Sequence, residues 1–232
     1  MTAADHSSFA PVAITRRSGL DESFHFGAVV GLERDGSFAF AVGDPRVVIY
    51  PRSSNKPMQA MAMVRAGLDL PRHLLALVCA SHSGEPTHVT SVRDLLAENG
   101  LDEEALGNTA DLPLDTAAAE DVIRSGGGPA PLYMNCSGKH AGMLATSRHN
   151  GWSTERVGPG SYLDPMHPLQ LRITATIAEL AGTAPANIGV DGCGAPAHAL
   201  ELVGLARAFR AIALEHGAVY EAMTGYPGMV GG

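Results

Sequence analysis

Alternating apolar and polar positions in the first part of the chain predict a β-hairpin. Two such runs, 27–33 and 37–42, flank the sequence Arg34-Asp35-Gly36. An Asp-Gly pair between alternating runs is a strong signal for the tight turn that joins two antiparallel strands. The short apolar run 47–50 predicts a third strand.

Apolar residues spaced three and four positions apart indicate helices in much of the remaining chain. This spacing predicts helices over residues 57–66, 86–99, 141–149, 165–182 and 198–216. Asp164 is placed to cap the helix that Pro165 opens. Residues 101–131 lack a clear period and contain three successive glycines, which predicts a long irregular segment.

This order of elements predicts an α/β or α+β fold in which helices surround a small antiparallel sheet. The sequence has no internal repeat, no long run of like charge and no clear linker. We therefore expect a single domain over residues 1–232, a length that can bury a substantial core.

Composition and charge exclude several classes of function. The chain carries a formal net charge of −8, which argues against a nucleic-acid surface because such surfaces need a basic patch. No stretch approaches the roughly 18 apolar residues of a membrane-spanning helix, and residues 1–19 lack the apolar core of a signal peptide. We expect a cytoplasmic protein with no membrane partner.

The three cysteines form an odd, sparse set that predicts free thiols rather than a disulfide framework. Cys79 ends the apolar run 74–79, which predicts a buried structural thiol. Cys136 and Cys193 instead lie in polar segments next to glycines. Each of these two is compatible with a small buried apolar side chain, but together they suggest a zinc site or a redox pair.

Ser53 and Lys56 form a Ser-x-x-Lys motif at the start of a predicted helix. On a helix this spacing puts both side chains on one face, so the lysine can accept the serine proton if its pKa is lowered. Pro57 biases Lys56 towards extended backbone and places it at the helix entrance. Alternatively, Ser53 or Asn55 simply caps the helix.

A second polar segment, 80–85, follows the apolar run 74–79 directly. Ser81, the imidazole of His82 and the carboxylate of Glu85 lie close together there. This combination is typical of a catalytic loop, and it is also compatible with a hydroxyl turn and an N-cap before the helix that Pro86 opens.

The segment 135–140 brings the Cys136 thiol and the Lys139 ammonium to another predicted helix start. Free N–H groups and the positive end of the helix dipole lower the pKa of a thiol at such a position. A second thiol, Cys193, lies beside the carboxylate of Asp191 in a glycine-rich turn.

Four segments in this order resemble the asparaginase II family, the rhizobial-type L-asparaginases. They are residues 51–60, 79–86, 134–142 and 190–196, and the resemblance extends over the chain from about Gly27. It implies a fold akin to the serine β-lactamases and glutaminases, a homodimer, and hydrolysis of L-asparagine to aspartate and ammonia.

The resemblance also implies roles for individual residues. It puts the catalytic roles on Ser53, Lys56 and Ser81, and the zinc ligands on Cys136, Lys139 and Cys193. From the same segments we expect substrate contacts by Arg52, His82, Glu85, Asn135 and Asp191.

One element of the family pattern is missing from this sequence. The family's second catalytic lysine belongs to a C-terminal Lys-x-Gly-Ala-Glu-Gly element that is absent here. We therefore expect a chain truncated at its C-terminal end, in which Ser81 has no lysine of its own. The alternatives are a glutaminase or penicillin-recognising serine hydrolase, or an inactive zinc-binding remnant. The chain lacks the Ser-Asp-Asn and Lys-Thr-Gly motifs that penicillin-recognising enzymes carry.

Overall fold

The predicted hairpin around Asp35-Gly36 is present in the computed structural model, which describes residues 6–232. Strands β3 (Val29–Leu32) and β4 (Phe38–Val42) pair antiparallel. Gly36 has φ +93°, a left-handed conformation that suits glycine at a tight turn. The predicted third strand is also confirmed as the short β5 (Val48–Ile49).

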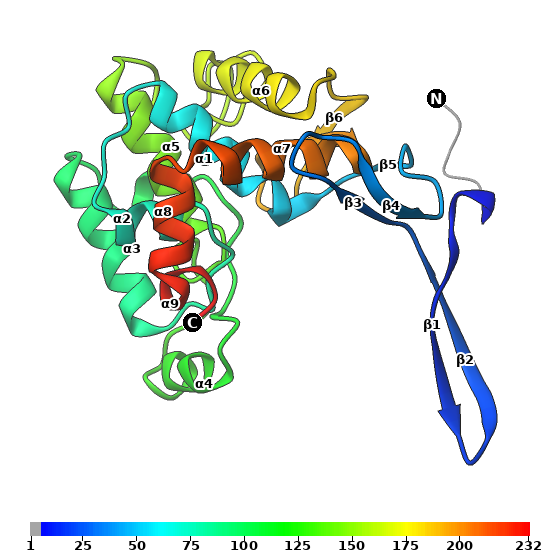
Figure 1. Ribbon diagram of the computed structural model, residues 1–232. Helices are drawn as coiled ribbons and strands as arrows, with labels where there is room; N and C mark the ends of the chain where they lie inside the picture. Colours follow the sequence, from blue (N-terminus) through cyan, green and yellow to red (C-terminus); the bar gives the residue numbers. More distant parts are fainter. Residues whose placement is uncertain (1–5) are drawn as a thin grey trace.

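A second hairpin, β1 (Ala10–Arg17) and β2 (Leu20–Gly27), precedes these strands and projects from the rest of the molecule as an arm (Figure 1). The sequence analysis missed it. The turn residues Ser18 and Gly19 both have positive φ, +48° and +88°, as tight hairpin turns require. The arm exposes apolar side chains at Val12, Ile14, Leu20, Phe24 and Phe26.

The third sheet joins distant parts of the chain in the order β5-β7-β6, with β6 at Asn187–Val190 and β7 at Pro196–Glu201. The helix predicted over 198–216 is therefore wrong at its start, since α7 spans Leu202–Glu215. His198, predicted to begin that helix, is instead buried in β7. A short alanine-rich apolar segment fits either period, which is why the pattern misplaced this boundary.

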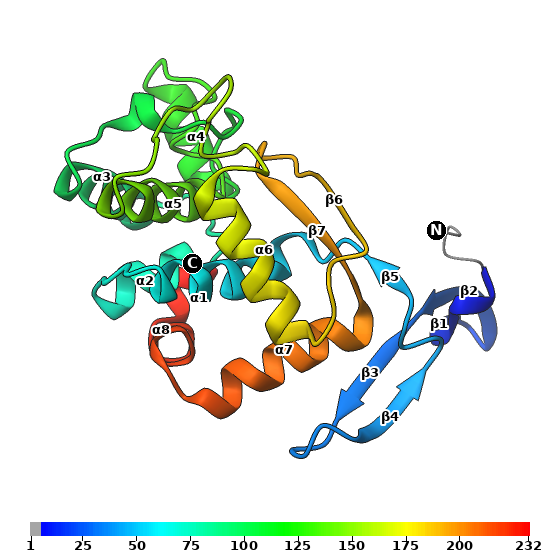
Figure 2. The same ribbon diagram turned by 90° about the horizontal axis from the view of Figure 1, so that it is seen from above.

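Helix α5 (Ser137–His149) forms the centre of the helical body and is buried from Ser137 to Ser147. It packs against α1 (Lys56–Arg65), α2 (Arg72–Val78), α3 (Pro86–Glu98) and α6 (Pro168–Ala181). A Cβ at Gly138 or Gly142 would come within 2.7 Å of Leu77 or Val78 side-chain atoms. These glycines let α5 approach α2 closely. Helices α8 (Ala218–Gly225) and α9 (Pro227–Val230) both pack against α2, and Figure 2 shows α8 beside α1 and α2.

Two predicted boundaries need correction. Helix α6 begins at Pro168 rather than Pro165, because His167 is its cap: its Nδ1 accepts from the Leu169 N–H at 3.2 Å. Asp164 instead accepts from the Met166 N–H in the preceding turn. The segment 101–131 is also less irregular than predicted, since it contains the short 3-10 helix η3 (Glu103–Ala105) and α4 (Thr116–Arg124), capped by Asp115.

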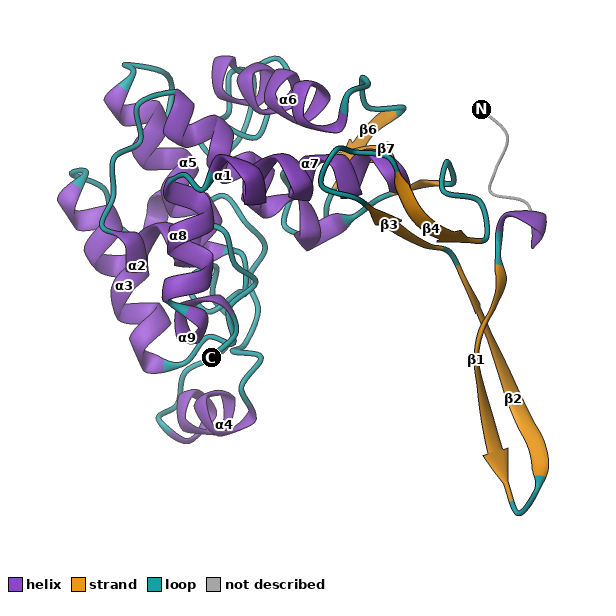
Figure 3. Ribbon diagram, in the orientation of Figure 1, coloured by secondary structure: helices purple, strands orange, loops and turns teal. Residues whose placement is uncertain are grey.

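The fold is thus a mixture of helices and small antiparallel sheets, as predicted at this coarse level. Figure 3 shows the helices gathered on one side and the three sheets on the other, with the arm outermost. Two short 3-10 helices, η1 (His6–Ser8) and η2 (Arg52–Asn55), complete the described elements. Within residues 6–232, none of the helices has both the length and the apolar content needed to cross a membrane.

Candidate active site

Lys56 lies where η2 runs directly into α1. Its backbone is helical, with φ −59° and ψ −38°, so the prediction of extended geometry before Pro57 is wrong. The preference for extended backbone before proline is outweighed here by the continuous η2–α1 turn. Asn55 makes no side-chain cap; it is buried, and its Nδ2 donates to the carbonyl of His198 at 3.2 Å. This bond ties the start of α1 to strand β7.

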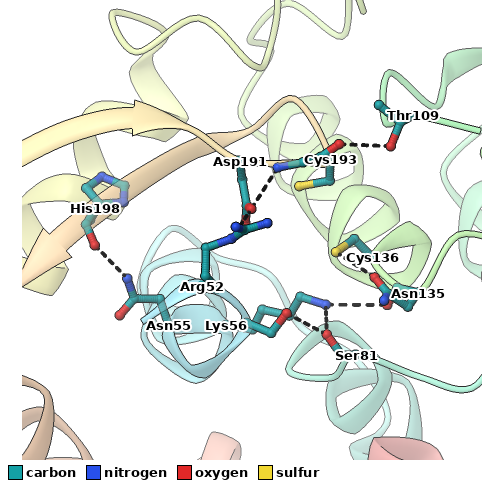
Figure 4. Close-up of polar contacts among 12 residues, drawn as sticks. Arg52, Asn55, Lys56, Ser81, Thr109, Asn135, Cys136, Asp191, Cys193 and His198 are labelled. Atoms are coloured by element: carbon teal, nitrogen blue, oxygen red, sulfur yellow. Dashed lines mark hydrogen bonds and ion pairs between the residues drawn. The ribbon is translucent and has the colours of Figure 1, made fainter. Parts of the chain in front are cut away.

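A chain of hydrogen bonds connects Lys56 to both predicted serines. Lys56 Nζ lies 2.7 Å from Ser81 Oγ, and Ser81 Oγ lies 2.7 Å from Ser53 Oγ. Figure 4 shows the Lys56 side chain extended towards Ser81 and the Asn135 carbonyl. The expectation that Ser81 has no lysine is therefore wrong, because Lys56 hydrogen-bonds Ser81 rather than the serine of its own motif.

The solvent exposure of the side chains decreases along this line of hydrogen bonds, from Ser53 to Lys56. Ser53 is exposed, Ser81 is half-buried and Lys56 is buried. Burial, with a contribution from the nearby Lys139 ammonium, lowers the pKa of Lys56. The carbonyls of Ala80 and Asn135 lie 2.5 and 3.4 Å from Nζ. A neutral Lys56 amine can donate to both and still accept a proton from Ser81.

Helix α2 positions Ser81 through the loop that follows it. The helix ends at Val78, and Cys79 is buried directly after it. Burial raises the pKa of Cys79 to about 12, and the prediction that this thiol is buried is confirmed. The rigid α2–α5 contact fixes where this loop leaves the core.

Arg52 and Asp191 form an ion pair beside the serines, with Arg52 Nε 2.6 Å from Asp191 Oδ1. Arg52 has φ +53°, a strained conformation for a residue with a side chain, and such strain often accompanies functional sites. The Arg52 side chain is 63% exposed, whereas Asp191 is 17% exposed. The pair thus combines a fixed carboxylate with a guanidinium open to solvent.

The two thiols and Lys139 also meet, although they come from α5 and the β6–β7 turn. Lys139 Nζ lies 3.1 Å from Cys193 Sγ, and Cys136 and Cys193 belong to one small buried cluster together with Ala195. Hydrogen bonds from Cys136 and His140, together with the Lys139 charge, lower the pKa of Cys193. The same contact, with burial, raises the pKa of Cys136. Both cysteines are unpaired and buried.

This group fits a zinc ion in its donor chemistry, since zinc binds thiolate sulfur and nitrogen. Two buried cysteine sulfurs and the Lys139 amine supply three such donors. The described residues contain no group of three or more His, Cys, Asp or Glu side chains that could hold a metal ion. The assignment of Cys136, Lys139 and Cys193 as zinc ligands stays a prediction.

The remaining predicted substrate contacts lie in different surroundings. Asn135 borders Lys56 through its carbonyl, and its Oδ1 lies 3.2 Å from Cys136 Sγ. His82, in the loop between α2 and α3, is buried. Its Nε2 lies 3.0 Å from Ser137 Oγ, and its ring stacks on that of His88. Glu85 occupies the N-cap position of α3 without making a side-chain cap. Substrate contacts of these residues stay predictions.

Several polar residues near the site were not selected from the sequence. They are Ser137, the partner of His82; His140; and Tyr162, whose hydroxyl lies 2.8 Å from His140 Nδ1. His140 and Ser137 fall inside the polar segment 135–140, which could have drawn attention to them. Tyr162 lies in a different segment, so only the fold brings it to His140.

A comparison of the sequence with models of protein families shows which family this chain belongs to. A family model described as L-asparaginase II matches residues 13–232. The chain belongs to the L-asparaginase II family. The match covers the four segments that resemble this family and all residues of the candidate site. A comparison with curated proteins gives no match to the chain.

Proposed function

We propose that this L-asparaginase II family member hydrolyses the side-chain amide of L-asparagine to give aspartate and ammonia. The observation that carries the proposal is the continuous chain Ser53–Ser81–Lys56, with 2.7 Å between successive side-chain atoms. It joins an exposed hydroxyl to a buried amine, which is the arrangement that a lysine-activated serine needs.

In the proposed reaction Ser53 is the nucleophile, because it is the exposed end of this chain. Its Oγ attacks the amide carbon while its proton passes to Ser81, and the Ser81 proton passes to the neutral Lys56 amine. The carbon–nitrogen bond then breaks, and protonated Lys56 returns a proton through the serines to the leaving ammonia. Water hydrolyses the resulting ester by the same route. Ser81 as nucleophile is the alternative, and it needs one proton transfer fewer.

We propose that Arg52 and Asp191 bind the amino-acid end of the substrate. The exposed Arg52 guanidinium suits an α-carboxylate, which it can bind in a bidentate manner. Asp191, held by Arg52 and by the Gly192 N–H at 2.8 Å, suits an α-ammonium group. This pair would select amino-acid amides over other amides.

We propose that Cys136, Lys139 and Cys193 hold zinc. When bound, the metal would supply Lewis-acid polarisation or orientation of the substrate. Lys139 must be neutral to serve as a ligand, and a bound cation favours that form. The chain's own thiols and amine keep this part of the site dry, because all three residues are buried.

We also propose that each chain has a fold akin to the serine β-lactamases and glutaminases, as the family resemblance implies. We further propose that two copies of the chain associate as a homodimer. The β1–β2 arm supports self-association, since a two-stranded hairpin is marginal alone and this one exposes Leu20, Phe24 and Phe26.

The direct test of the proposed function is ammonia release by the purified protein with L-asparagine and, in parallel, L-glutamine. We expect release from asparagine to exceed release from glutamine. Greater release from glutamine would favour the glutaminase alternative, and release from neither substrate would favour an inactive zinc-binding protein.

A further inference from the structure

The loop that carries Ser81 lies between α2 and α3 and has no regular structure of its own. Residues 80–85 belong to no helix or strand, so the position of the loop depends on its contacts with other elements. The Ser83 carbonyl accepts from the Asp115 N–H at 2.8 Å, at the start of α4. Helix α4 has no buried residue, so this attachment alone holds the loop weakly.

His88, in the first turn of α3, supplies a second attachment. Its side chain is buried, and its ring stacks on that of His82 with the ring centroids 5.2 Å apart. Its Nδ1 lies 3.4 Å from Ser83 Oγ. Its other ring nitrogen, Nε2, lies 2.9 Å from the carbonyl oxygen of Gly228 in α9. His88 therefore joins two residues of the loop to the helix α9.

The Gly228 carbonyl sets the direction of these hydrogen bonds. A carbonyl oxygen only accepts, so His88 Nε2 carries a hydrogen and donates it to Gly228. In the neutral imidazole Nδ1 is then the acceptor, and the Ser83 hydroxyl donates to it. Because α9 packs against α2, the His88 ring is oriented by an element that is itself held by the helical body.

The two loop residues that His88 contacts, His82 and Ser83, directly follow Ser81 in the chain. Ser81 Oγ lies 2.7 Å from both Lys56 Nζ and Ser53 Oγ. Ser53 and Lys56 belong to η2 and α1, so a displacement of the loop away from these elements would lengthen both hydrogen bonds. Proton transfer along the line depends on these short distances.

We propose that His88 is a positioning residue that docks the loop 80–85 on α9 and thereby keeps Ser81 Oγ between Ser53 and Lys56. The inference rests on the proton path of the proposed function. His88 acts through its contacts with the loop and is not itself a member of that path.

Steady-state kinetics with L-asparagine and amide hydrogen exchange of peptides that cover residues 80–85 test this role. His88→Phe keeps an aromatic ring against His82 and removes both hydrogen bonds of the imidazole. His88→Gln keeps an amide N–H near the Nε2 position, the donor to Gly228. Ser83→Ala removes only the hydroxyl that donates to Nδ1.

Two matched variants serve as controls. His149→Phe replaces an exposed histidine at the end of α5, and Ser91→Ala removes the hydroxyl of a half-buried serine on α3. Both should keep wild-type kinetics and wild-type exchange of the loop. Circular dichroism of each variant checks that the fold is kept.

We expect His88→Phe to lower kcat by about 10- to 100-fold and to leave KM unchanged, since a small misplacement of a reacting group costs about this much. Hydrogen exchange in the loop should become faster in the same variant. His88→Gln should recover part of the lost kcat. Ser83→Ala should lower kcat less than His88→Phe, and it should add nothing in the His88→Phe background because the hydroxyl acts through the imidazole.

A wild-type kcat in folded His88→Phe would overturn the inference while leaving the hydrolytic function intact. A lower kcat without faster exchange of the loop would overturn it as well. If His88→Phe does not fold, Ser83→Ala decides by the same criteria. A wild-type protein that releases no ammonia would refute the proposed function. The exchange data alone then decide the inference: faster exchange confined to the loop and α9 supports it, and unchanged exchange overturns it.

Discussion

Lys56 hydrogen-bonds Ser81 at 2.7 Å, although the two residues are 25 positions apart and Ser53 is the serine of the Lys56 motif. Lys56 begins α1 and Ser81 follows α2, and both helices pack against α5 and against each other. The Lys56–Ser81 contact joins two separate sequence motifs through one line of hydrogen bonds, which is the proton path of the proposed mechanism. Ser53 is the end of that path that faces solvent.

Replacing Lys56 tests the buried end of the path. Lys56→Met keeps a long apolar stem and removes the amine, so we expect asparagine hydrolysis to fall by about 100- to 10,000-fold, the range typical of a lost general base. The folded state should be at least as stable, because the variant no longer buries an amine. Ammonia release and thermal unfolding measure both effects, and Arg65→Met on the same helix is the control. A Lys56→Met enzyme with wild-type turnover would contradict the assigned role.

Ser81→Ala tests the relay itself. The change leaves Ser53 and Lys56 in place but removes the oxygen that lies 2.7 Å from each. We expect kcat to fall by about 100-fold or more with little change in KM, because proton transfer is impaired and substrate contacts are kept. Steady-state kinetics with asparagine provide the measurement. A change confined to KM would show that Ser81 binds substrate instead.

Arg52→Gln should weaken substrate binding more than it slows the chemical step. Losing a charged hydrogen bond costs about 1.5–3 kcal/mol, which predicts a KM raised by about 10- to 100-fold. Arg65→Gln breaks the comparable surface ion pair with Glu179 and should leave KM unchanged. Equal KM values for Arg52→Gln and wild type would remove Arg52 from the substrate site.

Acid should destabilise the protein through its buried histidines. Burial, with the charges of His88 and Lys56 nearby, lowers the pKa of His82 to about 3, and burial with the Lys139 charge lowers that of His198 to about 4. The ordinary pKa of histidine is 6.5. Below that pH these histidines bind protons in the unfolded chain, whereas in the folded state they stay neutral down to about pH 3–4. Stability is therefore full above the ordinary pKa and falls as the pH drops below it.

The expected loss is about 2 kcal/mol per histidine at about pH 5 relative to neutral pH. Urea denaturation at a series of pH values measures it. His198→Gln keeps a donor near Thr174, the partner of His198 Nε2 at 2.8 Å, and removes the titrating ring, so its stability should depend less on pH. An identical pH dependence in this variant would exclude His198 as a source.

The β1–β2 arm gives a test of self-association. Phe24→Ser with Phe26→Ser removes two exposed aromatic side chains and should convert the proposed dimer to a monomer in light scattering. Phe209→Ser on α7, also exposed, is the control and should stay dimeric. A wild-type monomer, or a dimer that survives loss of both aromatic residues, would contradict the proposed contact.

The sequence alone predicts elements that local rules determine. The Asp35-Gly36 turn, the helix that Pro86 opens and the buried Cys79 depend on neighbouring residues, and all three are confirmed. His198 was misplaced because an alanine-rich run suits both strand and helix, and only pairing with β5 and β6 decides between them.

The candidate residues could be selected from the sequence, whereas the contacts among them could not. Four separated segments supplied Ser53, Ser81, Lys139 and Cys193, yet the spacing of Ser53 and Lys56 suggested a direct pair. Only the packing of α1 against the α2 loop shows that Ser81 lies between them. The Tyr162 contact with His140 had no local signal, since it joins segments 22 residues apart.

The most direct test of the account is the initial rate of ammonia release from L-asparagine by the wild-type protein and by Ser53→Ala, with Ser54→Ala as the control. The account predicts release by the wild type and Ser54→Ala, and at least about a thousandfold loss in Ser53→Ala because the nucleophile is gone. Ammonia release by Ser53→Ala within about tenfold of the wild-type rate would contradict the central claim that Ser53 is the nucleophile of a Lys56-driven hydrolase.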